Sequence, residues 1–322
     1  MGKRVLIVGC GYVGLPLGHE LVKEGHQVFG LRRSATADAE LTANGVTPLH
    51  ADISDAASLA SLPRDYDWVV NCAATSGGTG EDYQRLYHQG TKNLIEWLRD
   101  ELPRKYVHTS STSVYGQNDG SLVVETDPVA PLTETSKVLV ATENLLLDAA
   151  SSGGANVPAS RSAKHFSDGS RVRSPHPLPA VILRVAGIYG PGRGYWLKQF
   201  LSGEARLDGD GSRYLNMIHR DDVVGAIIKA LKGAPVGSVC NVVDNEPVKQ
   251  RDLFAWLAAK LNKPMPPSAP ADEETIRKRG VTNKRVSNQR LKQQLGFQYK
   301  YPTFRQGYTA EIQQMRMAGK LS

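Results

Sequence analysis

The sequence predicts an α/β protein in which a Rossmann-type, doubly wound parallel sheet is joined to a smaller α+β C-terminal lobe. Three observations predict this fold class. Glycines at G-x-G-x-x-G spacing follow a short apolar run within residues 1–18. Apolar segments alternate with helical patterns through the first half of the chain. Past Gly187 this alternation loosens into turns rich in glycine and proline, which indicates that a second lobe begins there.

The expected elements follow one another along the chain. The strands are residues 4–8, 27–31, 46–50, 68–72, 106–109 and 180–185, and the helical patterns between them include residues 83–99 and 134–149. Parallel strands joined by helices need right-handed crossovers, which wind the sheet in both directions from its centre. A stretch at about 151–179, rich in Ser, Gly, Pro and Arg, is predicted to be a flexible surface insertion. A strand at 238–243 and a helix around 253–261 follow.

The glycine turn near the N-terminus predicts a dinucleotide site. Gly9 permits a tight turn, Gly11 lets a pyrophosphate approach the backbone, and Gly14 lets the next helix pack on the strand. Tyr12 and Val13 lie within the turn, where a helix N-terminus attracts phosphate. A glycine-rich turn without a ligand is the alternative, but a motif placed between a strand and a helix favours the cofactor site.

The residues after the second strand favour NADP over NAD. A dinucleotide-binding unit usually carries an acid there for the ribose hydroxyls, whereas this chain has Arg32 and Arg33. Guanidinium groups bind a 2′-phosphate that a carboxylate would repel. The alternative is that one of the two arginines is only surface charge. Asp52 and Ile53, after the third strand, are placed for contact with the adenine. Cys72, Ala73 and Ala74, after the fourth strand, are placed for contact with the nicotinamide ribose.

Composition narrows the remaining classes of function. The 322 residues are 40% hydrophobic and 22% charged, and no apolar run is long enough to cross a membrane. The three cysteines (Cys10, Cys72 and Cys240) are far apart and are interpreted as reduced thiols. No leader pattern and no paired metal ligands stand out. We therefore expect a cytoplasmic protein with neither a membrane nor a metal as partner.

The net charge of +7 is unevenly distributed. Nine Lys and Arg residues and no acid lie between 275 and 306. This run indicates either a site for an anionic, phosphate-bearing substrate or a solvated basic face. Nucleic-acid binding is not expected, because no helix-turn-helix pattern accompanies the charge.

Four segments resemble the extended short-chain dehydrogenase/reductases, also called the NAD-dependent epimerase/dehydratase family. They are residues 90–94 (GTKNL), 108–116 (HTSSTSVYG), 183–193 (LRVAGIYGPGR) and 217–223 (MIHRDDV). With the strand pattern, the resemblance implies an NAD(P)-binding lobe over residues 1–185, to which residues 217–243 return. Residues 186–322 are then mostly a substrate-binding lobe. The resemblance also implies a homodimer through the helices at 83–99 and 134–149.

The resemblance implies a catalytic serine but not a complete catalytic set. Ser111 would polarise a substrate carbonyl or hydroxyl beside the nicotinamide. The family's general acid/base is a tyrosine four residues before a lysine, whose charge lowers the pKa of the phenol. This chain lacks that pair, so it resembles an atypical member of the family.

Two alignments of the missing pair are open. Counting back from Lys137 puts Thr133 in the tyrosine's place. Aligning on Glu143 instead puts Thr135 in the tyrosine's place and Leu139 in the lysine's. A threonine hydroxyl holds its proton too tightly to titrate near neutral pH, so another group would have to move the proton.

Other side chains are candidates for this role. Tyr115 and Tyr189 lie in segments near the expected cleft, with aromatic packing around a hydrogen-bonded hydroxyl as the alternative. His219 could shuttle protons or serve as a structural residue where the lobes meet. The candidate substrate contacts in the second lobe are Arg213, Asn216 and Arg285.

The sequence thus predicts an NADP-dependent oxidoreductase or epimerase/dehydratase-like enzyme for a small polar substrate, with sugars and nucleotide sugars as candidates. The alternative is an NADP-binding sensor or scaffold without redox turnover, which would keep the cofactor half and lose the catalytic tyrosine. The opening residues (VGCGYVGLPL) also resemble nucleotide-sugar 6-dehydrogenases. Those enzymes need a catalytic cysteine on a glycine-rich loop, whereas Cys240 lies in a strand pattern.

Overall fold

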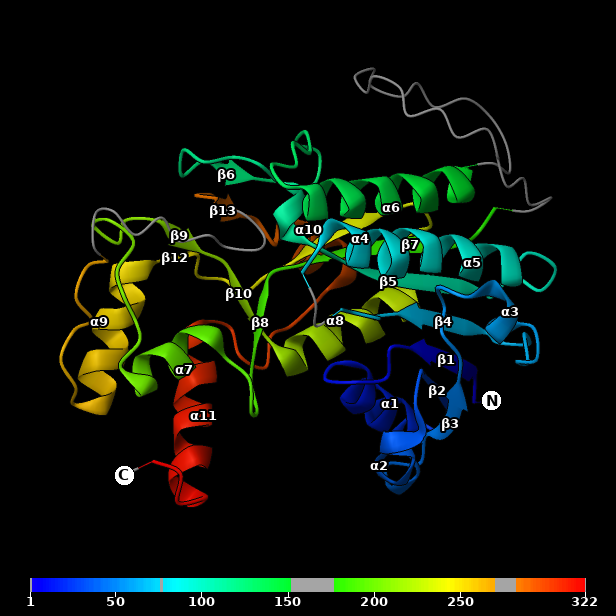
Figure 1. The fold of residues 1–322 in the computed structure, drawn as a ribbon, viewed down its shortest axis with the longest axis horizontal. Helices are drawn as coiled ribbons and strands as arrows, with labels where there is room; N and C mark the ends of the chain where they lie inside the picture. Colours follow the sequence, from blue (N-terminus) through cyan, green and yellow to red (C-terminus); the bar gives the residue numbers. More distant parts are fainter. Residues whose placement is uncertain (1, 76–77, 152–176, 270–281, 322) are drawn as a thin grey trace.

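In the part of the chain that the structure describes, seven parallel strands form one sheet (Figure 1). This computed structural model describes residues 2–75, 78–151, 177–269 and 282–321. The strand order across the sheet is β3-β2-β1-β4-β5-β7-β11. The strands are β1 (Arg4–Val8), β2 (Gln27–Arg32), β3 (Thr47–His50), β4 (Trp68–Asn71), β5 (Lys105–Ser111), β7 (Ala180–Val185) and β11 (Val239–Val242). This is the doubly wound order of dinucleotide-binding folds, so the predicted Rossmann-type α/β fold is confirmed.

Helices cover both faces of the sheet (Figure 1). One face carries α1 (Gly14–Lys23), α2 (Asp38–Ala43), α8 (Arg220–Gly233) and α10 (Gln289–Leu295), and the other α3 (Ala56–Leu59), α5 (Gly90–Trp97) and α6 (Glu134–Ser151). Alternate residues of β1 face opposite layers. Ile7 packs in the cluster that holds Leu17 of α1, and Leu6 in the cluster that holds Leu94 of α5. Burial on both faces explains why these strands are continuous apolar runs.

The helix that follows β4 changes its winding along its length. It begins as α4 (Gly80–Tyr83), where the Thr79 hydroxyl accepts the Asp82 amide at 3.1 Å. It continues as a π-helical segment (Gln84–Gln89) and then as α5. The sequence predicted one helix over 83–99, with no change of winding. π-Helical segments are often found at functional sites.

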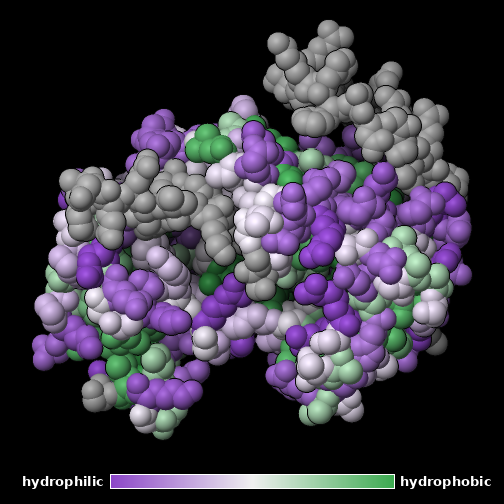
Figure 2. Space-filling view, in the orientation of Figure 1, coloured by the Kyte–Doolittle hydropathy of each residue, from purple (hydrophilic) through white to green (hydrophobic). Residues whose placement is uncertain are grey.

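A second, smaller lobe packs around its own core at the C-terminal side (Figure 1). It contains the paired strands β8 (Gly187–Tyr189) with β10 (Met217–His219) and β9 (Tyr214–Leu215) with β12 (Val248–Lys249), and the helices α7 (Tyr195–Ser202), α9 (Gln250–Leu261) and α11 (Phe304–Met317). Phe254 and Phe304 are fully buried in this core. Figure 2 shows a hollow between the two lobes, with hydrophilic side chains around it.

The chain crosses between the lobes more than once. After β10 it returns through α8 to β11, which joins the large sheet beside β7. The short strand β13 (Arg285–Val286) then pairs with β6 (Leu122–Val123). Most of the predicted insertion at 151–179 lies outside the described residues. The Leu178 amide donates to the carbonyl of Ala149 at 3.0 Å, so the segment leaves and re-enters the fold at neighbouring points.

His108 in β5 gives the fold a pH-dependent stability. Its ring is 2% exposed, and neither nitrogen has a hydrogen-bond partner among the described residues. Burial lowers the pKa of this imidazole from 6.5 to about 4. As pH falls below 6.5, the unfolded chain takes up a proton that the folded protein does not bind until about pH 4. The free energy of unfolding should therefore fall by about 3 kcal/mol across this window, measured by urea unfolding.

The variant His108→Leu should flatten this acid-side decline, because leucine carries no titrating group. His50→Gln is the control, since that imidazole is 42% exposed beside Asp38. It should keep the decline. Equal pH profiles for the wild type and His108→Leu would contradict the assignment.

Candidate active site

A cavity of about 630 Å³ opens at the carboxyl ends of the parallel strands. Its lining includes residues at the ends of five strands or just beyond them, and these are Val8, Arg32, Cys72, Ser111 and Val185. Open α/β sheets bind ligands at this edge, where the strand order reverses. The volume falls within the range of cofactor and substrate sites.

The glycine turn forms one wall of this cavity and fits a dinucleotide pyrophosphate. Gly9 has φ +81°, and a Cβ there would lie 2.4 Å from the Cα of Ala73. A Cβ on Gly14 would lie 2.7 Å from the Gly9 carbonyl oxygen, so this glycine lets α1 pack closely on the turn. A Cβ on Gly11, by contrast, would meet no described atom within 4 Å. No side chain caps α1, so the open space before its N-terminus suits a phosphate.

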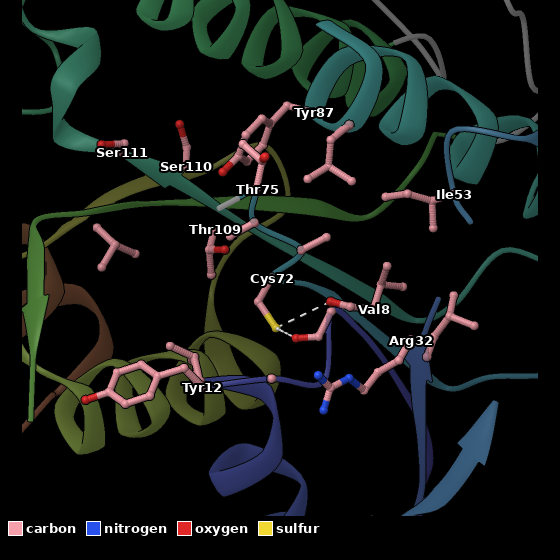
Figure 3. Close-up of a pocket in the computed structure, with 18 of the residues that line it drawn as sticks. Val8, Tyr12, Arg32, Ile53, Cys72, Thr75, Tyr87, Thr109, Ser110 and Ser111 are labelled. Atoms are coloured by element: carbon pink, nitrogen blue, oxygen red, sulfur yellow. Dashed lines mark hydrogen bonds between the residues drawn. The ribbon is translucent and has the colours of Figure 1, made fainter. Parts of the chain in front are cut away.

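Charged and apolar groups meet at the end of the cavity beside β2 and β3. Arg32 and Arg33 both line it, and Figure 3 shows the Arg32 guanidinium directed towards the cavity. Asp52 accepts the amide and the hydroxyl of Ser54 at 2.9 and 2.6 Å. Burial opposes ionisation of Asp52, but these bonds and the charge of Arg33 lower its pKa below the ordinary value. Ile53, 4% exposed, supplies an apolar wall.

Small residues line the cavity after β4. Cys72, Ala73 and Ala74 are all in the lining. The Cys72 thiol donates to the carbonyl oxygens of Val8 and Gly9 at 3.4 Å each (Figure 3), and burial raises its pKa. This thiol is therefore held as a neutral donor that ties β4 to the glycine turn.

Hydroxyl groups gather at the opposite end of the cavity, where β5 ends. Thr109, Ser110 and Ser111 are part of the lining (Figure 3). The Ser111 hydroxyl accepts the Ser113 amide at 3.2 Å, which fixes its position after the strand. The Ser110 hydroxyl donates to a Glu143 carboxylate oxygen at 2.5 Å. The cavity therefore has one basic end and one end rich in hydroxyls.

A buried polar chain runs from Ser110 into the core. Arg184, 6% exposed, forms an ion pair with Glu143 at 2.7 Å and donates to the Tyr115 hydroxyl at 2.7 Å. Tyr115 donates in turn to Asn241 at 2.9 Å. Burial raises the pKa of Tyr115, against the opposing effect of Arg184. Tyr115 is fully buried and is not in the cavity lining, as expected for aromatic packing around a hydrogen-bonded hydroxyl.

The structure does not bring Thr133 or Lys137 to the cavity. The Thr133 hydroxyl accepts the Ser136 amide at 3.2 Å at the start of α6. The Lys137 ammonium is exposed and lies 2.6 Å from Glu134 on the outer surface of that helix. Leu139 lines the cavity instead. Of the two alignments, the one based on Glu143 puts a residue of the lining, Leu139, in the lysine's place, and the choice between them stays a prediction.

Tyr189 and His219 are buried where the lobes meet. Tyr189 is 2% exposed, its ring centroid lies 4.5 Å from that of Tyr308, and burial raises its pKa. The His219 Nδ1 accepts the Asp221 amide at 3.1 Å and so caps α8, and its Nε2 lies 3.3 Å from Glu311. Neither Tyr189 nor His219 is in the cavity lining.

The three candidate substrate contacts also lie away from the cavity lining. Arg213 donates to Asp208 at 2.7 Å. The Asn216 amide binds backbone groups on both sides of Arg285, at 2.9 and 2.8 Å. Arg285 itself donates to the carbonyl of Gly120 at 2.9 Å. In the described residues these side chains bind other segments of the protein outside the cavity.

The basic run at 275–306 is described from residue 282 onwards. Lys284 is buried and donates to the Tyr115 carbonyl at 2.8 Å, and burial lowers its pKa to about 8. Lys300 pairs with Asp221 and Arg305 with Glu246. None of the described cations of this run lines the cavity.

Sequence reasoning missed several polar residues of the lining, and three of them have long side chains. Tyr83 and Tyr87 enter the cavity from the helix after β4, and Arg193 from the turn after β8. The spacing of four residues between the tyrosines was the available signal, because it puts both on one side of a helix. Arg193 lies 5.1 Å from the centre of the Tyr12 ring, within reach for a cation–π contact.

No helix in the described parts of the chain is long and apolar enough to cross a membrane. Cys240, which the sequence already placed in a strand and not on the loop that a thioester mechanism needs, is buried in β11, and burial raises its pKa to about 11. This thiol is not a thiolate at neutral pH.

The fold and the cavity define an NAD(P)-dependent enzyme of the extended short-chain type. The model of the NAD dependent epimerase/dehydratase family matches residues 5–242, and the chain belongs to this family. The predicted resemblance is thus confirmed, and the family's cofactor is NAD(P).

Named relatives cover almost the whole chain. The protein YeeZ of Escherichia coli is 29% identical over 312 residues, which are 93% of this chain and 97% of that protein. A 3-diazoavenalumate denitrifying reductase of Streptomyces is 26% identical over 330 residues, with 96% and 100% of the two chains covered. The solved structure of a UDP-glucuronic acid 4-epimerase from Bacillus cereus, in complex with UDP-glucuronic acid and NAD, has a TM-score of 0.74. It is 22% identical, covers 98% and 99% of the two chains, and shows the likeness of fold.

Proposed function

We propose that this protein is an NADP-dependent oxidoreductase for a small polar substrate with a carbonyl or hydroxyl group. The observation that carries the proposal is a single cavity with two different ends. Arg32 and Arg33 lie at one end, and Ser110 and Ser111 at the other, with the open space above Gly11 between them.

Each part of the cavity has a role in this proposal. Arg32 and Arg33 bind the 2′-phosphate, and Gly11 admits the pyrophosphate to the backbone. Asp52 contacts the adenine. NADPH, when bound, supplies a hydride. The Ser111 hydroxyl donates a hydrogen bond to the substrate carbonyl and so polarises it.

Sugars and nucleotide sugars are the substrates that we propose first. Hydrophilic side chains surround the hollow between the lobes (Figure 2), which suits a ligand with many hydroxyls. The fold neighbour from Bacillus cereus is bound to UDP-glucuronic acid. We also propose a homodimer through the helix at residues 83–99 and α6, which packs against the π-helical segment of that helix, to be tested by light scattering.

The first test concerns Gly11. The variant Gly11→Ala should fold normally, because its Cβ would meet no described atom, yet bind NADPH at least about ten-fold more weakly, because the methyl group occupies the space of the pyrophosphate. NADPH fluorescence titration measures the affinity. Gly233→Ala is the matched control, since its Cβ also meets nothing within 4 Å and it lies at the end of α8. Equal NADPH affinity in Gly11→Ala and the wild type would count against this cofactor site.

The second test separates an enzyme from a sensor or scaffold. A panel of carbonyl compounds and nucleotide sugars is incubated with the protein and NADPH, and NADPH oxidation is followed. We expect turnover that Ser111→Ala lowers without changing NADPH affinity. NADPH binding with no turnover on any compound would favour the sensor.

A further inference from the structure

A phenol from another helix can supply the proton that α6 cannot. We propose that Tyr87 is the general acid of the reaction and donates its hydroxyl proton to a substrate carbonyl held by Ser111. This inference rests on the proposed function, because it takes the cofactor cavity as the place of reaction.

The position of Tyr87 suits this role. The residue lines the cavity and is 7% exposed. Figure 3 shows its hydroxyl end on the same side of the cavity as Thr75 and Ser110, near the end of β5. The ring packs on that of Tyr83 with centroids 4.8 Å apart. The phenol therefore reaches the hydroxyl-rich end of the cavity from the helix wall, with its ring held in place by packing.

The backbone around Tyr87 is also unusual. The residue lies in the π-helical segment Gln84–Gln89, between the regular helices α4 and α5. The wider turn of a π-helix changes the direction in which a side chain leaves the helix axis, and such segments often occur at functional sites. The residues before and after this segment are α-helical, so the π-helical turn interrupts one helix. The interruption lies where that helix lines the cavity.

Most other titratable groups of the lining lie away from its hydroxyl-rich end. The Cys72 thiol donates to carbonyl oxygens of the glycine turn. Asp52 lies at the basic end and accepts two hydrogen bonds from Ser54. Tyr12 lies across the cavity from Ser110 and Ser111 (Figure 3), its ring contacts Arg193, and burial raises the pKa of its phenol to about 12. Tyr83 is the remaining rival, and the experiment below includes it.

The family's missing tyrosine and lysine would lie on α6. What α6 presents there instead is compatible with a proton donor on the helix that carries Tyr87. Leu139 lines the cavity, and Thr135 is 5% exposed, so α6 presents no phenol and no ammonium group there.

As a hydride from NADPH forms the new C–H bond, the carbonyl π bond breaks. The Tyr87 O–H bond also breaks and its proton passes to the carbonyl oxygen. NADPH is thereby oxidised to NADP⁺, and a proton from the buffered solvent returns to the phenolate, so the net reaction consumes one NADPH and one proton.

The first arm of the test uses activity. NADPH-dependent reduction of diacetyl, and of any nucleotide sugar turned over in the panel above, is compared for the wild type, Tyr87→Phe, Tyr83→Phe and Tyr195→Phe. Tyr87→Phe should lower kcat about a hundred- to ten-thousandfold, the usual contribution of a general acid. Its NADPH affinity by fluorescence titration should stay within a few-fold of the wild type. The decline of kcat at high pH should vanish in Tyr87→Phe, because that limb reports the loss of the acid's proton. Tyr195, 58% exposed, is the control.

The second arm needs no substrate. NADP⁺ is added at mildly alkaline pH and the ultraviolet absorbance of tyrosinate is recorded. The positive nicotinamide ring beside a phenol favours its ionised form, so the wild type and Tyr195→Phe should gain tyrosinate absorbance and Tyr87→Phe should not.

The outcomes separate this inference from the proposed function. If the wild type does not bind NADPH, the proposed function fails and Tyr87 has no role of this kind. If NADPH binds, but Tyr87→Phe matches the wild type in activity or in tyrosinate absorbance, the assignment of Tyr87 is overturned and the proposed function stands. Loss of activity in Tyr83→Phe, with Tyr87→Phe unaffected, would also overturn it and move the role to Tyr83.

Discussion

Replacing both Arg32 and Arg33 with alanine is expected to weaken NADPH binding by about a hundred- to ten-thousandfold, with NADH binding unchanged within a few-fold. Both residues line the cavity at the end of β2. Charge-assisted hydrogen bonds are worth about 1.5–3 kcal/mol each, and about 1.4 kcal/mol corresponds to a factor of ten in affinity. NADH has no 2′-phosphate to lose these contacts. Parallel fluorescence titrations with the two reduced cofactors measure the effect.

Arg104→Ala is the control for this loss of charge. Its side chain is 76% exposed and lies beside Asp67, outside the cavity lining. It should change the affinity for neither cofactor. An equal preference of the wild type for NADH and NADPH would show that the two arginines do not select the cofactor.

The variant Glu143→Gln is expected to lower the free energy of unfolding by about 3–5 kcal/mol, because it leaves Arg184 as an uncompensated buried charge. The side chains of Glu143 and Arg184 are 2% and 7% exposed and lie 2.7 Å apart. The same carboxylate also accepts the Ser110 hydroxyl. Urea unfolding followed by circular dichroism measures the loss.

Glu134→Gln on the same helix provides the matched comparison. Glu134 lies 2.6 Å from Lys137, but both side chains are exposed, at 76% and 57%. Such surface pairs contribute about 0–1 kcal/mol, so this variant should unfold almost like the wild type. Similar losses for the two glutamines would mean that burial does not set the strength of the Glu143 pair.

Much of the fold could be predicted because it depends on local patterns. Strand β1 and strand β7 were predicted with the bounds that the structure shows, since apolar runs bounded by turns define buried parallel strands. Strand β5 is longer than predicted. It extends to Ser111, where hydroxyl side chains rather than apolar ones complete the strand.

The catalytic end was harder to predict because it depends on contacts between distant segments. Lys137 and Leu139 are two residues apart in α6, and two helical steps of about 100° turn their side chains to nearly opposite sides. Choosing between the two alignments therefore reverses which residue faces the cavity. Tyr115 is drawn away by Arg184 and Asn241, which are 69 and 126 residues further along the chain. Spacing along the sequence carries no information about such partners.

The leucine at position 139 has a consequence for the electrostatics of the chemistry. In the family to which this chain belongs, an ammonium group beside the phenol makes it ready to accept a proton as well as to give one. Leu139 places hydrocarbon at that point of the lining. No permanent cation on α6 would then offset the negative charge that develops on oxygen during turnover. That task would fall to neutral hydrogen-bond donors such as the Ser111 hydroxyl, so one side chain would change how charge is stabilised at this end of the cavity.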